Sequence, residues 1–379
     1  MISLPVIKIP SRESANTEAQ KQAPPKGGDV FVLEIEKEEL KIGLYTKKVE
    51  SIQSIGTEII SKDNYNFENS LNDPETINDI KLKIKKLTAL YPTKSKNLII
   101  GITQRNIISY TKTVRIKRIN SESKINQKEI DDFVEKIIAN CKDEVLSDKE
   151  SIDIELLNSD VIFTKVDGYI TKEPQGMRGG TIEISIFVNF INADYLEEIL
   201  SFTNNIGLNL VTIASSIYAF NKALENNIDS NYMLIDINEN TTNIGIIFAG
   251  ELFYATYISF GFNDLLEFMK TKHNLNKQES INALSGKTSD ENIIKSKNNL
   301  FDFYYELISL RIQNAKKIKV LPENIVIVGK KAINTDKQLL INNLSSLNFK
   351  GEPVATILNT DNLTFFEKSY IRLNGGKTR

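Results

Sequence analysis

The hydrophobic and polar positions of this chain recur with two periods, one typical of strands and one typical of helices. Apolar residues predict three consecutive strands near the start of the folded part, over Val30–Ile35, Leu40–Thr46 and Val49–Ile60. Apolar residues at helical spacing predict a helix from about Pro74 to Tyr91, and the apolar run NLIIGIT at residues 97–103 predicts a central strand. The pattern therefore indicates an α/β fold.

The middle of the chain, residues 107–203, has a different order of elements. A strand is followed by an amphipathic helix whose apolar stripe contains Ile130, Phe133, Val134, Ile137 and Cys141. Two further strands follow around the turn DGYITKEPQGMRGG, and a helix predicted over Ala193–Ile206 ends at Gly207, a residue typical of helix C-termini. This order predicts a small α+β subdomain inserted into a larger domain. The turn between its strands is a candidate partner-binding loop, although a long hairpin turn is the simpler interpretation.

The second half resembles the first in its opening elements. A strand leads into a helix near residues 209–225, and the stretch Met233–Phe262 predicts a β-hairpin. Helices are predicted over Phe262–His273, over Lys277–Lys319 with a polar loop at Ser285–Ser296, and over Thr335–Leu347. Because each half begins with a strand–turn–strand unit and continues into helices, we expect two related lobes. The predicted divisions are a flexible tail at 1–28, the first part of lobe I at 29–106, the subdomain at 107–203, and the rest of lobe I with lobe II at 204–379.

Composition excludes several functional classes. The 379 residues have a formal net charge of -2, which does not favour a bulk binder of nucleic acid. The chain has one cysteine and one histidine, so neither an internal disulfide framework nor a histidine-based metal site is expected. We see no secretory signal, no long apolar segment and no apolar stripe in the C-terminal RLNGGKTR, and we expect no direct membrane insertion. The chain is therefore predicted to be cytoplasmic, with membrane association only through a partner.

Three turns contain residues suited to phosphate and Mg²⁺. The first is EIEKEELK at residues 34–41, the second is DINENTT at residues 236–242, and the third is the strand end IVGK at residues 327–330. A carboxylate at a strand-to-strand turn can hold a metal ion, and hydroxyls and backbone N–H groups beside it can hold phosphate. The alternative interpretation of the second turn is an ordinary asparagine-rich hairpin turn.

These turns and the order of elements resemble the actin-like ATPase superfamily. Within it the chain most resembles the FtsA family of cell-division proteins, with the PilM family of type IV pilus proteins as a close relative. The resemblance covers nearly all of residues 29–375. The inserted subdomain is similar to an SHS2-type module in a run that contains Val166, Gly168, Tyr169, Pro174, Gly176 and Gly180.

The resemblance implies a nucleotide site with ATP as cofactor. Its members in this chain would be Glu34, Lys41, Asp236, Asn238, Thr241, Thr242, Glu279, Gly329 and Lys330. Asp236 would be the ligand of Mg²⁺. The chain departs from the family pattern where glycines are expected, since Glu36 and two neighbouring glutamates stand in the first turn. Glycine lets backbone donors approach a phosphate, whereas carboxylates repel it. We therefore expect weak or lost ATP binding, little hydrolysis and no catalytic residues.

The resemblance implies a cytoplasmic scaffold that takes part in cell division. Such a protein would form homo-oligomers or filaments and would bind protein partners, a tubulin-like division filament or an inner-membrane division protein. The alternative is a PilM-like component of a type IV pilus complex that binds the tail of an inner-membrane protein. A third possibility, from another class, is an active ATP-dependent phosphotransferase or chaperone-type ATPase. Nucleic acid is not an expected partner.

Overall fold

The computed structural model describes residues 28–47, 52–62, 65–148, 152–224, 230–315, 318–329 and 336–358. The chain divides into two compact units, of which the second contains residues Thr103–Arg105 and the described residues from Ser216 onward, and the first contains the other described residues. The predicted tail lies outside the described residues except for Gly28, the first residue of β1. Within the described ranges the strands form three sheets, and no helix is long and apolar enough to span a membrane.

The first sheet begins with an antiparallel meander and ends with two parallel strands, in the order β3-β2-β1-β4-β9. Its strands are β1 (Gly28–Ile35), β2 (Glu39–Lys47), β3 (Ile52–Ser61), β4 (Asn97–Ile102) and β9 (Asn209–Ser215). Alternate residues of β1, such as Leu33, pack with Ile80 of α1 (Pro74–Leu90) and Phe202 of α3 (Ala193–Ile206) in one buried core. The residues between them, including Glu34, point to the opposite face because side chains alternate along a strand.

The second unit repeats this topology with the order β12-β11-β10-β13-β14. Its strands are β10 (Tyr232–Ile237), β11 (Thr242–Phe248), β12 (Glu251–Ile258), β13 (Asn324–Val328) and β14 (Val354–Ile357). Its helices are α4 (Ser216–Leu224), α5 (Phe262–His273), α6 (Lys277–Leu284), α7 (Glu291–Gln313) and α8 (Lys337–Leu344). Ile235 of β10 shares a core with Leu265 of α5, Tyr304 of α7 and Leu340 of α8, and α4 contacts β10, β11 and β12.

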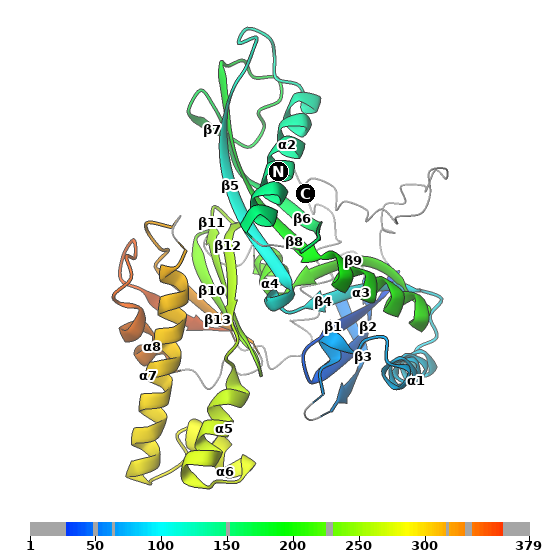
Figure 1. The fold of residues 1–379 in the computed structure, drawn as a ribbon, viewed down its shortest axis with the longest axis vertical. Coiled ribbons are helices and arrows are strands. Elements are labelled where there is room, and N and C mark those ends of the chain that lie inside the picture. The colour runs from blue at the N-terminus through cyan, green and yellow to red at the C-terminus, as the bar shows by residue number, and fades with distance from the viewer. Residues whose placement is uncertain are drawn as a thin grey trace. The chain divides into compact units, whose positions relative to one another are not determined.

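The third sheet is the predicted inserted subdomain, and Figure 1 shows its long strands beside α2 (Gln127–Asp148). The order is β5-β8-β6-β7, and every pair is antiparallel. The strands are β5 (Ile107–Lys117), β6 (Ile154–Val166), β7 (Tyr169–Thr171) and β8 (Thr181–Asn192). Ile130, Val134, Ile137 and Cys141 of α2 are buried against Ile184 and its neighbours on one face of this sheet. Two short 3-10 helices, η1 (Phe67–Asn69) and η2 (Gln104–Asn106), lie at connections between strands and helices.

Most predicted elements agree with the structure, and α3 and α5 have the predicted bounds. The predicted loop at Ser285–Ser296 is wrong in its second part, because α7 already begins at Glu291. The side chain of Asp290 accepts hydrogen bonds from the backbone N–H groups of Asn292 and Ile293, and this N-cap starts the helix among polar residues. The short strand β7 was not predicted from the sequence. It forms because Asp167 and Gly168 make a tight turn with positive φ at both residues.

Candidate functional site

The first predicted phosphate turn connects β1 and β2. Glu34 and Lys41 are paired residues of these two antiparallel strands, and both are almost fully buried, at 4% and 2% exposure. Paired side chains lie on the same face of a sheet with their Cβ atoms about 5 Å apart. The first turn therefore begins with a buried acidic residue and a buried basic residue on the same face of the sheet.

The backbone of this first turn is engaged by the protein itself. The N–H of Glu36 donates to the carbonyl of Glu39 at 2.9 Å, and the N–H of Phe67 donates to the carbonyl of Lys37 at 2.8 Å. The N–H of Lys62 donates to the carbonyl of Glu38 at 3.1 Å. Glu36, at the position where a glycine was expected, is itself buried. Backbone groups of this turn are therefore hydrogen-bonded within the protein, and its side chains include carboxylates. The turn lacks the glycines that would expose backbone donors.

The second turn contains a buried hydrogen-bond network centred on Asp236. Asp236 is 0% exposed, and three side chains donate hydrogen bonds to its Oδ2 atom. The donors are Ser216 Oγ at 2.6 Å, Asn238 Nδ2 at 2.9 Å and Asn243 Nδ2 at 3.0 Å. Asn243 Nδ2 also donates to Ser216 Oγ at 3.1 Å, so the donors are connected to one another. A Mg²⁺ ion at Oδ2 would have to displace protein donors, and the residues as arranged do not fit a metal at this atom.

The two threonines of the turn have different surroundings. Thr242 is fully buried, and its hydroxyl donates to the carbonyl of Phe260 at 2.9 Å. The hydroxyl of Tyr304 on α7 lies 2.5 Å from the same oxygen, and since the proton of Thr242 is used on Phe260, Tyr304 is the donor in this contact. Burial raises the pKa of Tyr304 far above its ordinary value, so it stays protonated as a donor. The hydroxyl of Thr242 is thus engaged inside the core, while Thr241 is buried nearer the turn.

The N-terminus of α5 lies against this second turn. The N–H groups of Phe262 and Asn263 donate to the carbonyls of Asn238 and Glu239 at 3.0 and 2.8 Å. A Cβ atom on Gly261 would lie 2.6 Å from the carbonyl oxygen of Glu239, so only glycine fits at this approach. The first amides of the helix, which in many proteins bind anions, here bind the backbone of the hairpin.

The third turn meets the second in unit 2. Gly329 follows β13 with φ of 108°, and a Cβ atom there would lie 2.3 Å from the carbonyl oxygen of Ile237 and 2.9 Å from Asp236 Oδ1. The structure therefore brings Asp236, Asn238 and Gly329 together within unit 2. Lys330 lies outside the described residues. Glu34 and Lys41 belong to unit 1 and are paired with each other.

Glu279, the last predicted site residue, has a local partner. It is exposed at the start of α6, where its Oε2 accepts from the N–H of Asn276 at 2.8 Å. Asn276 Oδ1 in turn accepts from the N–H of Glu279 at 2.9 Å, which completes a capping box. No group of three or more metal-ligating His, Cys, Asp or Glu side chains occurs among the residues that the structure describes.

Four participants in this region were missed by sequence reasoning, namely Ser216, Asn243, Gly261 and Tyr304. Two of them carry a sequence signal in retrospect. Asn243 is a polar residue at the start of an otherwise apolar strand, and Ser216 stands where a strand becomes a helix. Gly261 and Tyr304 carry no comparable signal, because their contacts are with residues distant in the sequence.

The fold that positions these residues is the actin-like ATPase fold: two units whose sheets have the same strand order, with an additional sheet inserted between β4 and β9 of the first. The structure is similar to that of a PilM–PilN type IV pilus biogenesis complex, with a TM-score of 0.62 and 13% identity over 92% of this chain and 98% of that chain. The ethanolamine utilization protein EutJ from Carboxydothermus hydrogenoformans gives a TM-score of 0.49 and 13% identity, over 93% of this chain and 91% of that chain. No protein-family model matches the chain, and no curated protein matches it.

Proposed function

We propose that this protein is an actin-fold scaffold that binds other proteins and does not depend on ATP hydrolysis. The observation that carries the proposal is the network around Asp236, whose Oδ2 atom accepts from Ser216, Asn238 and Asn243. A metal-dependent ATPase needs an accessible carboxylate for Mg²⁺ near the phosphates. Here the carboxylate of Asp236 is fully buried, and three side chains of the protein donate to one of its oxygens.

The partner that we propose is the tail of an inner-membrane protein. The structural neighbour with a TM-score of 0.62 is a PilM–PilN complex, in which an actin-like protein is bound to another protein. This chain would act in the same manner, as a cytoplasmic component that reaches the membrane through its partner. The type IV pilus setting is favoured by this likeness. The cell-division setting, with an FtsA-like role, a tubulin-like filament as partner and self-assembly into filaments, is the alternative.

The two settings make different predictions for purified proteins. In the pilus setting the chain binds a peptide from the cytoplasmic tail of an inner-membrane pilus protein, and isothermal titration measures the affinity. In the division setting it cosediments with preformed tubulin-like filaments. Binding to the tail peptide without cosedimentation supports the pilus setting. Cosedimentation without binding to the peptide supports the division setting.

Titration with nucleotide tests the role of the turns. We expect Mg·ATP to bind weakly to the wild type, with no release of phosphate over hours. Glu36→Gly combined with Glu38→Ser would strengthen binding, because it removes two carboxylates from the turn and restores a glycine that can expose backbone donors. Asp236→Asn would weaken any Mg²⁺-dependent part of the binding. Turnover of ATP by the wild type, lost in Asp236→Asn, would contradict the scaffold proposal and support an active phosphotransferase or chaperone-type ATPase.

A further inference from the structure

The helix α1 packs beside β3 in unit 1 (Figure 1), and the charge of its exposed side differs between its two halves. In the first half, the carboxylates of Glu75 and Asp79 contact the ammonium group of Lys62 at 3.1 and 3.4 Å. From residue 80 to residue 97 the chain has six lysines and neither aspartate nor glutamate. These lysines are Lys81, Lys83, Lys85, Lys86, Lys94 and Lys96. The second half of the helix and the segment after it are therefore strongly basic.

Carboxylates on the neighbouring strands neutralise only part of this charge. Glu58 of β3 contacts the ammonium groups of both Lys83 and Lys86, at 3.2 and 2.6 Å, so one negative charge serves two lysines. Asp29 of β1 accepts a hydrogen bond from the Thr93 hydroxyl at 2.6 Å. Among the described residues, Glu58 is the only ion-pair partner of the six lysines.

The acidic residues of α3 and β2 are placed differently. Asn72, which precedes α1, donates a hydrogen bond to the carbonyl of Glu198 on α3 at 2.9 Å. At 1.5 Å per residue, Asn72 is about 20 Å from Lys86 along the helix axis, so this contact is at the other end of α1. Glu34 and Glu39 point to the face of the first sheet opposite α1, because their neighbours along β1 and β2 are in the core that α1 covers.

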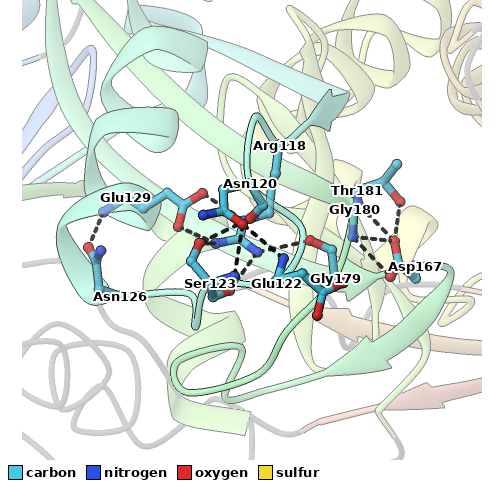
Figure 2. Close-up of polar contacts among 10 residues, drawn as sticks. All are labelled: Arg118, Asn120, Glu122, Ser123, Asn126, Glu129, Asp167, Gly179, Gly180 and Thr181. Atoms are coloured by element: carbon cyan, nitrogen blue, oxygen red, sulfur yellow. Dashed lines mark hydrogen bonds and ion pairs between the residues drawn. The ribbon is translucent and has the colours of Figure 1, made fainter.

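The inserted subdomain shows the contrasting case, in which charged groups have local partners. The Nε and Nη2 atoms of Arg118 donate to the two carboxylate oxygens of Glu129 at 2.7 and 2.9 Å (Figure 2). The carboxylate of Asp167 accepts from the N–H groups of Gly180 and Thr181, at 3.0 and 2.8 Å. The lysines of α1, in contrast, are in excess over the carboxylates around them.

Two large apolar side chains stand among these lysines. Leu82 and Leu90 are 63% and 69% exposed. Leu82 and Ala89 are seven residues apart, close to two helical turns, so they lie on one line along the exposed side of the helix. Between them, Lys85 and Lys86 lie on either side of this line. The exposed side of α1 is therefore an apolar line flanked by positive charges.

The width of this line and its charge indicate the kind of partner. The broad apolar face of α1, which includes Ile80 and Leu87, is already packed in the core of unit 1. A helix that lies on a membrane needs a broad apolar face on its outer side, whereas a narrow apolar line with flanking charges is the contact surface of a helix pair. We propose that the exposed side of α1 binds an acidic amphipathic helix of a partner protein, whose apolar residues pack on Leu82 and Ala89 and whose carboxylates pair with the lysines. This deepens the scaffold function, on which it rests, by assigning a surface to one partner.

The test uses the full chain and two labelled synthetic helical peptides. Both have leucine at the a and d positions of a heptad repeat, and one has glutamate and the other lysine at the e and g positions. Fluorescence anisotropy measures binding to the wild type. We expect the glutamate peptide to bind at least about tenfold more tightly than the lysine peptide, and added salt should reduce the difference.

Substitutions on α1 test the surface itself. Lys81→Glu combined with Lys85→Glu should weaken binding of the glutamate peptide at least about tenfold and strengthen binding of the lysine peptide, because the charge beside the apolar line is reversed. Leu82→Ser should weaken binding of the glutamate peptide about tenfold, since it removes an apolar contact and keeps every charge.

Matched controls come from the inserted subdomain. Lys128→Glu combined with Lys136→Glu makes the same change of net charge on the exposed side of α2. Ile170→Ser removes an apolar side chain that is 71% exposed. Both controls should leave the affinity for the glutamate peptide unchanged.

Three results with the peptides would overturn the proposal. They are equal affinity for the two peptides, no binding of the glutamate peptide, and binding that Lys81→Glu with Lys85→Glu leaves unchanged while circular dichroism shows both proteins folded. Peptide binding does not involve the turn at Asp236, so a failure here is distinguishable from a failure of the nucleotide experiment.

Sedimentation experiments cover the other occupants of this surface. Binding to vesicles of phosphatidylglycerol and phosphatidylcholine that the α1 double variant abolishes, without any preference for the glutamate peptide, would overturn the proposal and assign the surface to an anionic membrane. A wild-type dimer that the same variant converts to a monomer would overturn it in favour of a second copy of this chain.

Discussion

Asn243 lies directly opposite Asp236 in the antiparallel pair of β10 and β11, and its Nδ2 atom donates to Asp236 Oδ2 at 3.0 Å. In the first sheet the residues at the corresponding paired positions are Glu34 and Lys41. Each carboxylate is on the next-to-last residue of the first strand of its sheet. Glu34 is opposite a lysine, and Asp236 is opposite the amide side chain of an asparagine. The duplicated fold therefore places a buried carboxylate twice at the same position, opposite a different type of residue in each sheet.

Removing the carboxylate of Asp236 should destabilise unit 2. Asp236→Ala leaves the hydroxyl of Ser216 and the amides of Asn238 and Asn243 without their acceptor in a buried site, which should lower the free energy of unfolding by about 3 kcal/mol or more. Urea denaturation measures the change. Glu267→Ala removes an exposed carboxylate of α5 and should leave the free energy of unfolding nearly unchanged. Ser216→Ala combined with Asp236→Ala should cost less than the sum of the single changes, and full additivity would argue against the network.

Gly329 and Gly250 form a matched pair for the close approach at Asp236. Both have positive φ, of 108° and 84°. A Cβ atom on Gly250 meets nothing within 4 Å, whereas one on Gly329 would lie 2.3 Å from the carbonyl oxygen of Ile237. Gly250→Ala should therefore cost only the conformational strain, about 1 kcal/mol. Gly329→Ala should cost more than about 3 kcal/mol because the backbone must shift. Thermal unfolding of both variants measures which one loses more stability. Equal losses of stability would show that the structure relieves the crowding at Gly329 without cost.

The guanidinium of Arg118 should contribute to the stability of the inserted subdomain. Arg118→Met breaks a buried pair with Glu129 and removes the donors to Ser123 and Gly179, with an expected loss of about 3 kcal/mol. Arg118→Lys should recover only part of it, since an ammonium group cannot reproduce the planar fork. Lys142→Met, in a more exposed pair with Glu155 on the same subdomain, is the control and should cost less than about 1 kcal/mol. Chemical denaturation followed by circular dichroism measures all three.

Asp167 should make the β6–β7 turn sensitive to acid. Hydrogen bonds from the N–H groups of Gly180 and Thr181 hold the pKa of Asp167 below its ordinary value of 3.8. A carboxyl whose pKa is lowered by folding stabilises the folded state above its unfolded pKa, and this contribution is lost as the pH falls through the folded pKa. The amide resonance of Thr181 should therefore titrate with a midpoint below 3.8. Asp167→Asn should abolish that titration, and its persistence would assign the midpoint to another group.

The elements themselves follow from local sequence. Helices α3 and α5 have their predicted bounds because periodicity and capping are properties of neighbouring residues, as Gly207 at the end of α3 illustrates. The loop predicted before α7 was too long because the polar residues after Asp290 form an exposed face of the helix, and a polar stretch alone does not distinguish the two.

The amino-acid sequence by itself determined the mixed α/β order, the duplicated strand–turn–strand openings and the three turns that deserved testing as a site. Only the tertiary structure decided how those turns are used. The donors to Asp236 include Ser216, which lies 20 positions earlier, and the hydroxyl of Thr242 meets Tyr304, which lies 62 positions later. Such partners come together through sheet pairing and helix packing. An aspartate and a threonine in such a turn can either bind a metal ion or complete a buried core. The sequence pattern is the same in both cases, so it does not distinguish them.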